Sequence, residues 1–278
     1  MRILLLSILF FSFYANSEPN NLFSRRYITP KDEHVIKLFN EHSATKKINP
    51  YNFNILVWNV YKGLNKDFHK DFSHFSQDQD IVLLQEAHLD TNFNQIFTYS
   101  ADFSFVFATA WIDNKYKTSV SSGVMTGSIQ KPELYKWQRS YYLEPVIRTP
   151  KMALFSKYYL EEVDKVLMVG NIHAINFVST KKFRHMIRES VKEISAHDGP
   201  IIFAGDFNTW SKRKTHFLKS EMKRLGFTEV VFEQDYRKRF LGNILDYVFV
   251  KDLKVHHSSA PASNGSDHNP MLVNLSVL

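Results

Sequence analysis

Short apolar runs with strand composition follow one another along this chain from Phe53 onward, and they constrain its fold more than any other feature. Several are apolar at successive positions, as expected of strands that are covered on both faces. The runs are FNILVW, DIVLLQ, FSFVFA, SGVMTG, KMALF, VLMVGNIH, PIIFAG, ILDYVFV and PMLVNLSV. The sequence therefore predicts a domain built on β-sheet with both faces buried.

Two stretches between these runs have apolar residues at helical spacing. They span Thr180 to His197 and Ser211 to Leu225. Their apolar residues recur every three or four positions, at Phe183, Ile187, Val191 and Ile194 and at Phe217, Leu218, Met222 and Leu225. Strands interleaved with helices predict an α/β or α+β layered domain. Because no internal repeat or second boundary follows Pro50, we expect one domain over residues 51–278.

The N-terminus has the layout of a secretory signal peptide. Arg2 precedes an apolar run from Ile3 to Tyr14, and small residues follow at Ala15 and Ser17. The run is shorter than the roughly twenty residues that span a bilayer. We expect residues 1–17 to be cut after Ser17 and the protein to be exported, to the periplasm or out of the cell. An uncleaved membrane anchor is the alternative.

The stretch that follows, residues 18–50, is polar and basic. Lys31 to Ser43 carries apolar residues in the pattern of a short amphipathic helix, at Val35, Ile36, Leu38 and Phe39. Residues 18–50 are therefore predicted to form a leader and an outer helix.

Composition limits the classes of site and of partner. The chain has no cysteine, which rules out a disulfide framework, thiolate zinc sites and a cysteine nucleophile. Hydrophobic residues make up 44% of the chain and aromatic residues 15%, so a sizeable core is expected and global disorder is excluded. A pI near 9.3 favours anionic partners such as nucleic acid, phosphorylated lipid or an anionic membrane face. The sequence points to no obligate protein partner.

Polar residues stand at the ends of six of the strand segments, where ligand sites form in layered folds. In chain order they are Asn59, Glu86, His173, Asp206 with Asn208, Asp246, and Asp267 with His268. Each taken alone is more simply structural, because Gly-Asp-Phe-Asn is a competent turn and a histidine in an apolar run is more often a core residue. Their combination points to a site.

Hydrolysis of a phosphate ester needs this mixture of groups. It uses oxygen ligands for a hard cation, an activated water, proton donors, and neutral donors that hold the phosphoryl oxygens. Glu86, with Asn59 and Asp267 beside it, is predicted to bind Mg²⁺, with Mn²⁺ as the alternative ion. Without cysteine or paired histidines at helical spacing, a closed zinc site is disfavoured.

The ordered set WN, QE, a strand-borne histidine, GDFN, LDYVFV and SDHNP resembles the endonuclease/exonuclease/phosphatase superfamily, which includes the pancreatic-type deoxyribonucleases. The resemblance runs from about Phe53 to Val277, and GDFN followed by SDH is its most specific part. It implies an α/β (α+β) four-layer sandwich, with two face-to-face β-sheets flanked by helices. The phrases RTPK, NIHAINF and GDFNTWS are most similar to a bacterial exported or envelope branch.

Matching positions imply roles at the metal and substrate. Glu86 resembles the principal metal ligand, Asn59 a neighbour that orients metal or phosphate, and Asp267 a second metal-linked carboxylate. Arg148, in VIRTPK, resembles a phosphate-contacting arginine, and Asn176 is a predicted substrate contact.

The same matching implies catalytic roles. Asp206 and Asn208 resemble the pair that positions the attacking water and helps to deprotonate it. His268, oriented by Asp246, resembles the phosphate-facing histidine, and His173 resembles the histidine that protonates the leaving oxygen. A carboxylate and a carboxylate-buttressed imidazole are both competent general bases, so the base stays open between them.

One position departs from part of the superfamily. Abasic-site endonucleases carry an acidic residue two positions after the motif asparagine, where this chain has Tyr61 followed by Lys62. A second metal ligand from that strand is absent, which argues against abasic-site repair.

The substrate class divides the remaining hypotheses. A phosphodiesterase acting on DNA or RNA is favoured by three basic clusters, because lysine and arginine beside the cleft would neutralise phosphates. The clusters are Lys181, Lys182 and Arg184; Lys212, Arg213 and Lys214; and Arg237, Lys238 and Arg239. A phospholipase C-like or phosphoinositide-directed enzyme that acts on membrane lipid is the alternative, and would need Trp137 to Leu143 as an exposed apolar loop. A catalytically inactive binding protein with the same fold is a third hypothesis.

Overall fold

The computed structural model describes residues 26–116 and 118–278, so the predicted signal peptide and the leader up to residue 25 lie outside the described residues. The first sheet contains β1 (Tyr27–Ile28), β2 (Ile36–Phe39), β3 (Phe53–Asn59), β4 (Ile81–His88), β5 (Ser104–Tyr116), β6 (Thr118–Ser128), β12 (Gln234–Asp235), β16 (Leu253–Ala260) and β17 (Met271–Val277). Its strand order is β1-β5-β6-β4-β3-β17-β16-β12, with β2 also paired to β5.

The second sheet contains β7 (Leu134–Arg139), β8 (Met152–Leu160), β9 (Lys165–His173), β10 (Ile201–Asp206), β11 (Thr228–Glu229) and β15 (Asp246–Lys251). Its order is β11-β15-β10-β9-β8-β7, and a separate small hairpin pairs β13 (Arg239–Phe240) with β14 (Asn243–Ile244). The helices are α2 (Phe68–Ser76), α3 (Ile96–Tyr99), α4 (Thr180–Ser195) and α5 (Lys212–Arg224). Short 3-10 turns occur at η1 (Asp32–His34), η2 (Tyr61–Gly63), η3 (Phe93–Gln95) and η4 (Glu161–Val163).

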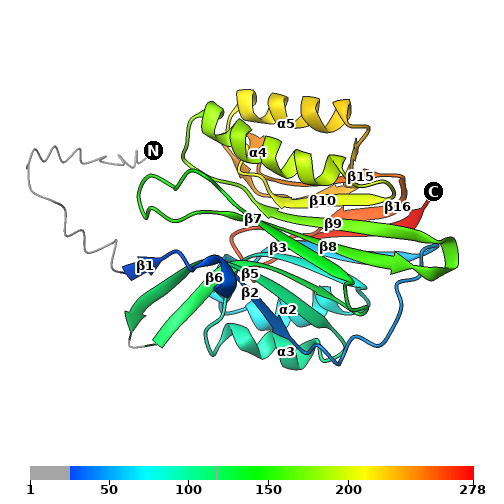
Figure 1. The fold of residues 1–278 in the computed structure, drawn as a ribbon, viewed down its shortest axis with the longest axis horizontal. Coiled ribbons are helices and arrows are strands. Elements are labelled where there is room, and N and C mark those ends of the chain that lie inside the picture. The colour runs from blue at the N-terminus through cyan, green and yellow to red at the C-terminus, as the bar shows by residue number, and fades with distance from the viewer. Residues whose placement is uncertain (1–25, 117) are drawn as a thin grey trace, which may run out of the picture.

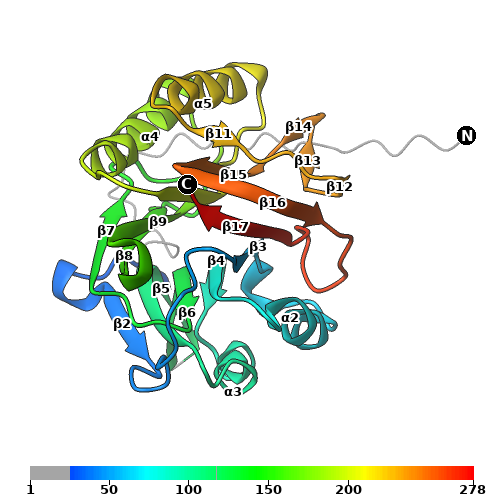
Figure 2. The same cartoon turned by 90° about the vertical axis from the view of Figure 1, so that its right-hand side faces the viewer.

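The two sheets pack face to face, with α4 and α5 outside the second sheet and α2 and α3 outside the first (Figures 1 and 2). Successive side chains of a strand point to opposite faces, so each central strand supplies two cores. Val57 of β3 and Ile202 of β10 lie in the core between the sheets, whereas Trp58 packs toward α2 and Phe203 toward α4 and α5. Each such side chain contributes roughly 1.5–3 kcal/mol on burial. The predicted four-layer sandwich is confirmed.

The nine predicted apolar runs all contain strand residues, and the two predicted helices are present as α4 and α5. The helix predicted within Lys31 to Ser43 is wrong. That stretch forms η1 and then β2, in which Ile36 and Leu38 pair with Ala108 and Val106 of β5. The open edge of β5 offers backbone hydrogen bonds to this segment, and alternating burial satisfies the apolar residues that also suit a helix. Residues 27–39 thus add strands to the first sheet.

The exposed apolar loop suggested for Trp137 to Leu143 is only partly present. Trp137 lies in β7, the edge strand of the second sheet, where it is half-buried and stacks under the Arg139 guanidinium at 5.1 Å. Alternation along β7 turns Trp137 toward the core that contains Leu154, so this residue belongs to the fold. Among the residues that the structure describes, no helix has the length and apolar character needed to cross a membrane.

Candidate active site

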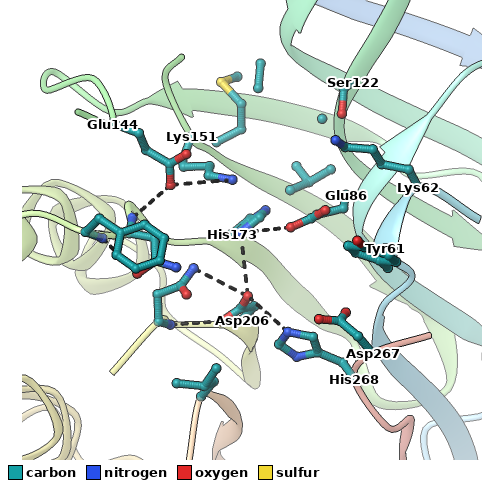
Figure 3. Close-up of a pocket in the computed structure, with 18 of the residues that line it drawn as sticks. Tyr61, Lys62, Glu86, Ser122, Glu144, Lys151, His173, Asp206, Asp267 and His268 are labelled. Atoms are coloured by element: carbon teal, nitrogen blue, oxygen red, sulfur yellow. Dashed lines mark hydrogen bonds and ion pairs between the residues drawn. The ribbon is translucent and has the colours of Figure 1, made fainter. Parts of the chain in front are cut away.

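The predicted polar residues come together because the strands that carry them end at one edge of the sandwich. β3 runs parallel to β4 in one sheet and β9 runs parallel to β10 in the other, so each pair presents its carboxyl ends together. A pocket of about 450 Å³ opens there (Figure 3). Seven of the predicted site residues line it: Glu86, His173, Asn176, Asp206, Asn208, Asp267 and His268.

Asp206 lies at the centre of the site, since its strand partners are His173 on β9 and Asp246 on β15. Gly205 allows the close approach of β9 and β10 just before it. Its φ is 138°, and a Cβ there would lie 2.0 Å from the carbonyl oxygen of Ile172, which leaves no room for a side chain. The carboxylate is therefore placed by the backbone of its own strand.

The contacts of Asp206 reach four other predicted site residues. Its Oδ1 accepts the backbone N–H of Asn208 at 2.9 Å, and its Oδ2 accepts the Asn59 Nδ2 donor at 3.0 Å. Oδ2 also lies 3.5 Å from His173 Nε2 and 4.0 Å from His268 Nε2. One carboxylate thus faces two imidazoles and two amides.

His268 and Asp246 form a buried imidazole–carboxylate pair, with His268 Nδ1 2.8 Å from Asp246 Oδ2. The loop before β17 is fixed from β3, because Trp58 Nε1 donates to the His268 carbonyl at 2.9 Å and Ser266 Oγ donates to the Asn59 carbonyl at 2.6 Å. The predicted orientation of His268 by Asp246 is therefore present in the structure.

Glu86 reaches the pocket through a β-bulge. The register of β4 on β6 shifts between Gln85 and Ala87, and Glu86, between them, has a φ of 56°. A bulge adds a residue to one strand and re-aims its side chain, while positive φ in a non-glycine residue is a strained conformation often found at functional sites. The Glu86 carboxylate consequently lies 3.9 Å from His173 Nε2.

The two histidines differ in protonation. Burial lowers the pKa of His173 well below its usual value, and the positive charges of Lys151 and His268 lower it further. Burial also opposes charge on His268, but the charge and hydrogen bond of Asp246 outweigh it and raise the pKa of His268. Burial, followed by repulsion from Asp246, raises the pKa of Asp206. The free protein at neutral pH therefore holds a neutral His173 and a charged His268.

The pocket offers donors suited to a hard cation. The carboxylates of Glu86, Asp206 and Asp267 face the same open space in Figure 3. Oxygen ligands of this kind match Mg²⁺ and Mn²⁺. A cation would also relieve the burial cost that raises the Asp206 pKa. A second grouping, Asp206, Asp246 and His268, has ligand atoms within 4.8 Å of one another, but the His268 Nδ1–Asp246 contact already occupies part of it.

Asn59 is placed differently from a direct metal ligand. It is 2% exposed, and it lies behind Asp206 rather than in the pocket lining. Its Nδ2 donates to Asp206, and its Oδ1 accepts the backbone N–H of Tyr61 at 3.1 Å. Asn59 therefore positions the Asp206 carboxylate.

Lys151, rather than the predicted Arg148, lies at the pocket. Arg148 is exposed on the loop between β7 and β8 and does not line the pocket. Three residues later Lys151 lines the pocket, with Nζ 3.6 Å from Glu144 Oε1. The same Glu144 atom accepts the backbone N–H of Asn176 at 3.0 Å. The motif RTPK contains both cations, and only the conformation of the loop shows which of them reaches the pocket.

Tyr61 and Lys62 follow the motif asparagine, where abasic-site endonucleases carry an acidic residue. Both line the pocket. The Lys62 ammonium lies 5.5 Å from the ring centre of Trp111, which also lines it. This part of the rim is thus cationic and aromatic, a combination that suits an anionic, planar group.

Beneath the pocket a buried amide pair joins the two sheets. Gln85 Nε2 donates to Asn171 Oδ1 at 2.8 Å, and Asn171 Nδ2 donates to the Met125 carbonyl at 2.9 Å. Both residues precede site residues on their strands, Glu86 and His173. In the sequence these two residues stand out only as polar residues inside apolar runs, and no local pattern indicates that they contact each other.

The three predicted basic clusters have different environments. Arg237 is buried and paired with Asp235 at 2.8 Å, and Lys238 donates to the Asp267 carbonyl at 2.7 Å. Lys214 is 1% exposed, with its ammonium 4.3 Å from the ring centre of Trp210. The suggestion that Lys214 grips a polyanion is therefore wrong, because the helix turns it inward beneath a pocket-lining ring.

Comparison with known proteins agrees with this geometry. Residues 56–268 match the model of the Endonuclease/Exonuclease/phosphatase family. A UPF0294 protein of Vibrio campbellii is 36% identical over 81% of this chain and 77% of its own length. An endonuclease/exonuclease/phosphatase from Beutenbergia cavernae has a similar fold, with a TM-score of 0.62 at 15% identity over 82% of this chain and 72% of that one. The human Nocturnin catalytic domain, solved with a bound sulfate anion, gives 0.59 at 15% identity over 87% and 98%.

Proposed function

This chain belongs to the endonuclease/exonuclease/phosphatase family, a family of phosphoester hydrolases, and we propose that it is a divalent-metal-dependent phosphodiesterase that cleaves DNA or RNA. The observation that carries the proposal is the position of Asp206. Its carboxylate faces His173 at 3.5 Å and His268 at 4.0 Å in a pocket that also receives the Glu86 carboxylate. These are the groups needed to activate water and to hold a phosphoryl group.

The roles follow from the contacts. Asp206, held by Asn59 and the Asn208 backbone, accepts a proton from the attacking water, whose oxygen bonds to phosphorus as the ester P–O bond breaks. The leaving oxygen takes up a proton from solvent water at the open mouth of the pocket and departs as an alcohol. The charged His268, kept in place by Asp246, faces the phosphoryl oxygens. His173 donates a hydrogen bond from Nε2 to substrate oxygens that lie between Glu86 and Asp206. Glu86 and Asp267 would hold Mg²⁺ or Mn²⁺, which supplies charge stabilisation when bound.

Nucleic acid is the favoured substrate because of the rim of the pocket. Lys62 supplies positive charge, together with Lys151 and Lys238, which also pair with Glu144 at 3.6 Å and Asp267 at 3.4 Å. Trp111 and Phe177 supply aromatic faces. Phosphates interact with the first group and bases stack on the second. A net charge of +7 and a pI near 9.3 act in the same direction.

Membrane lipid is the second candidate, on one observation. Tyr141 and Val146, on the loop between β7 and β8, are 77% and 78% exposed, and neighbouring Ile147 lines the pocket. Exposed apolar side chains beside a phosphoesterase pocket can enter a lipid interface.

The deciding assay presents the purified chain with Mg²⁺ or Mn²⁺ to plasmid DNA, RNA, sphingomyelin vesicles and phosphoinositide vesicles in parallel. We expect chain cleavage of DNA or RNA and little turnover of either vesicle. Turnover of vesicles with intact DNA and RNA would replace the nuclease proposal with the lipid one. No turnover of any phosphoester, with the protein folded and metal present, would support the inactive binding protein.

Export is also proposed, and its support is the sequence of residues 1–17. Arg2, the apolar run and the small residues Ala15 and Ser17 predict cleavage that leaves Glu18 at the N-terminus. Mass spectrometry of the protein recovered from an expressing bacterium is expected to find this mature end in a periplasmic or secreted fraction. Recovery of intact Met1 in the membrane fraction would indicate an anchor instead.

A further inference from the structure

A basic cleft lies between α4 and α5, which pack side by side on the outer face of the second sheet (Figures 1 and 2). Its volume is about 320 Å³. The residues that line it define the α4–α5 cleft: Thr180, Lys181, Arg184, Arg188 and Arg213. Four of these five side chains are cationic, and the fifth is neutral.

The α4 cations share one face of the helix. Lys181, Arg184 and Arg188 stand at positions i, i+3 and i+7, which brings them into one stripe, and Arg213 of α5 completes the cleft. The guanidinium groups of Arg184 and Arg188 rest on the same ring, that of Phe217 of α5, at 4.9 and 5.6 Å from its centre. Stacking limits the freedom of both arginines, so their N–H groups are partly pre-organised to bind an anion.

In the described part of the chain, no acidic side chain pairs with the cations of the cleft. Across residues 26–116 and 118–278, no carboxylate lies within ion-pair distance of the four cations of the cleft. The opposite halves of the same helices behave differently, because there Lys192 pairs with Glu189 and Arg224 pairs with Glu221. The acidic residues of α4 and α5, which are Glu189, Glu193 and Glu221, thus all follow the cleft-lining residues of their helices in the sequence.

The positions of the cations are unfavourable for the isolated helices. Neither α4 nor α5 has an acidic residue in its first turn, where Lys181 and Arg213 lie. The positive end of a helix dipole repels cations and attracts anions. Lys181 and Arg213 at these two ends, and Arg184 and Arg188 further along α4, therefore repel one another until an anion enters, and a bound phosphate would interact favourably with all four.

The chain connects this cleft to the active site by two short paths. Phe177 lines the catalytic pocket and Thr180 lines the cleft, while Trp210 lines the pocket and Arg213 lines the cleft. Each path is three residues long, which is at most about 11 Å between Cα atoms. One strand of nucleic acid can therefore reach both places.

We propose that the α4–α5 cleft binds a backbone phosphate of the nucleic-acid strand whose scissile phosphate lies in the catalytic pocket. This inference rests on the proposed nuclease function, because it takes both phosphates to belong to one strand. The cleft contributes affinity and register on the strand. It takes no part in breaking the ester bond.

The test compares the full chain with R184Q/R188Q/R213Q and with a charge-matched control, K70Q/K223Q/K254Q. The control removes three exposed lysines that lie on α2, at the far end of α5 and on β16. A labelled single strand of about twelve nucleotides is titrated in EDTA at several salt concentrations, and binding is followed by fluorescence anisotropy. Bis(p-nitrophenyl) phosphate and a dinucleotide serve as substrates too short to reach the cleft.

For the cleft variant we expect the affinity for the long strand to fall at least ~tenfold at low salt, and the slope of log affinity against log salt to flatten by about 0.7 per phosphate released. The control variant is expected to change both quantities much less. The charge-preserving R184K/R188K/R213K should recover most of the slope. Turnover of the two short substrates should stay within about twofold of wild type, which also shows that the variant is folded.

An unchanged salt slope in the cleft variant would overturn the inference, as would equal losses in the cleft and control variants. Loss of binding to phosphatidylglycerol vesicles, with binding of the oligonucleotide intact, would overturn it too by assigning the cleft to lipid. The two proposals fail separately. Strand binding through the cleft without hydrolysis of any phosphodiester would contradict the proposed nuclease function. DNA cleavage with an unaltered KM in the cleft variant would contradict the proposed role of the cleft.

Discussion

Replacing Glu86 by alanine is expected to lower the rate of phosphodiester hydrolysis by ~10²-fold or more. The Glu86 carboxylate enters the pocket from a β-bulge and faces the space shared with Asp206 and Asp267. It is the predicted principal ligand of the cation, so its loss removes charge stabilisation of the phosphoryl group in the transition state. The measurement is kcat and KM over a Mg²⁺ or Mn²⁺ titration, with the long DNA substrate and the small diester.

The control for this substitution is Glu162→Ala, which removes an exposed carboxylate of η4. It should leave the rate unchanged. Because alanine at position 86 must adopt the same positive φ as glutamate, the thermal midpoint of both variants is measured as well. Chelation of the wild-type protein should abolish hydrolysis, and added Mg²⁺ should restore it. A folded Glu86→Ala protein with wild-type kcat would contradict the assignment of the metal.

The layered fold could be predicted because its evidence is local. Strand runs such as IVLLQ and VLMVG are apolar on both faces, and α4 and α5 carry one apolar stripe each. The local sequence of each segment therefore indicates which of its faces are buried. β2 was mistaken because Ile36, Leu38 and Phe39 fit helix and strand alike. The free edge of β5, which decides between them, is formed by residues far away in the sequence.

The gathering of these polar residues at one pocket could be predicted from the motifs, but their contacts with one another could not. Asp206, His173 and Asp246 meet through the register of three adjacent strands, which no local pattern states. The choice between Arg148 and Lys151 depends on how one loop turns, and the inward direction of Lys214 depends on the packing of α5 against Trp210. Tertiary geometry therefore determines the contacts within a set of residues that the motifs had already indicated.

The α4–α5 cleft shows the same division. The sequence shows its residues as clusters of lysine and arginine, but charge alone does not distinguish a solvated helix face from a binding site. The distinction comes from two observations: Arg184, Arg188 and Arg213 have no acidic partner among the residues that the structure describes, and they gather around one cavity. Lys214, in the same sequence cluster, supports the pocket wall instead.

Replacing Asp246 by asparagine is expected to lower kcat by ~10²-fold or more while leaving KM nearly unchanged. Asparagine keeps the size of the side chain and can still accept a hydrogen bond, so the buried site retains its packing. It removes the negative charge that, 2.8 Å from His268 Nδ1, holds the imidazole in its orientation and in its charged form. Alanine is avoided, because breaking a buried ion pair costs roughly 3–5 kcal/mol and would confuse catalysis with folding.

The pH profile separates this role from a merely structural one. In the wild type burial opposes the charged imidazole, and the Asp246 carboxylate overcomes that opposition and raises the pKa of His268 to about 10. The imidazolium is therefore retained as pH rises through neutrality and is lost only near the raised pKa. Without the carboxylate the pKa of His268 falls, so the alkaline loss of activity should move to lower pH in Asp246→Asn. A uniformly reduced rate with an unshifted profile would mean that Asp246 supports the fold around His268 without controlling its charge.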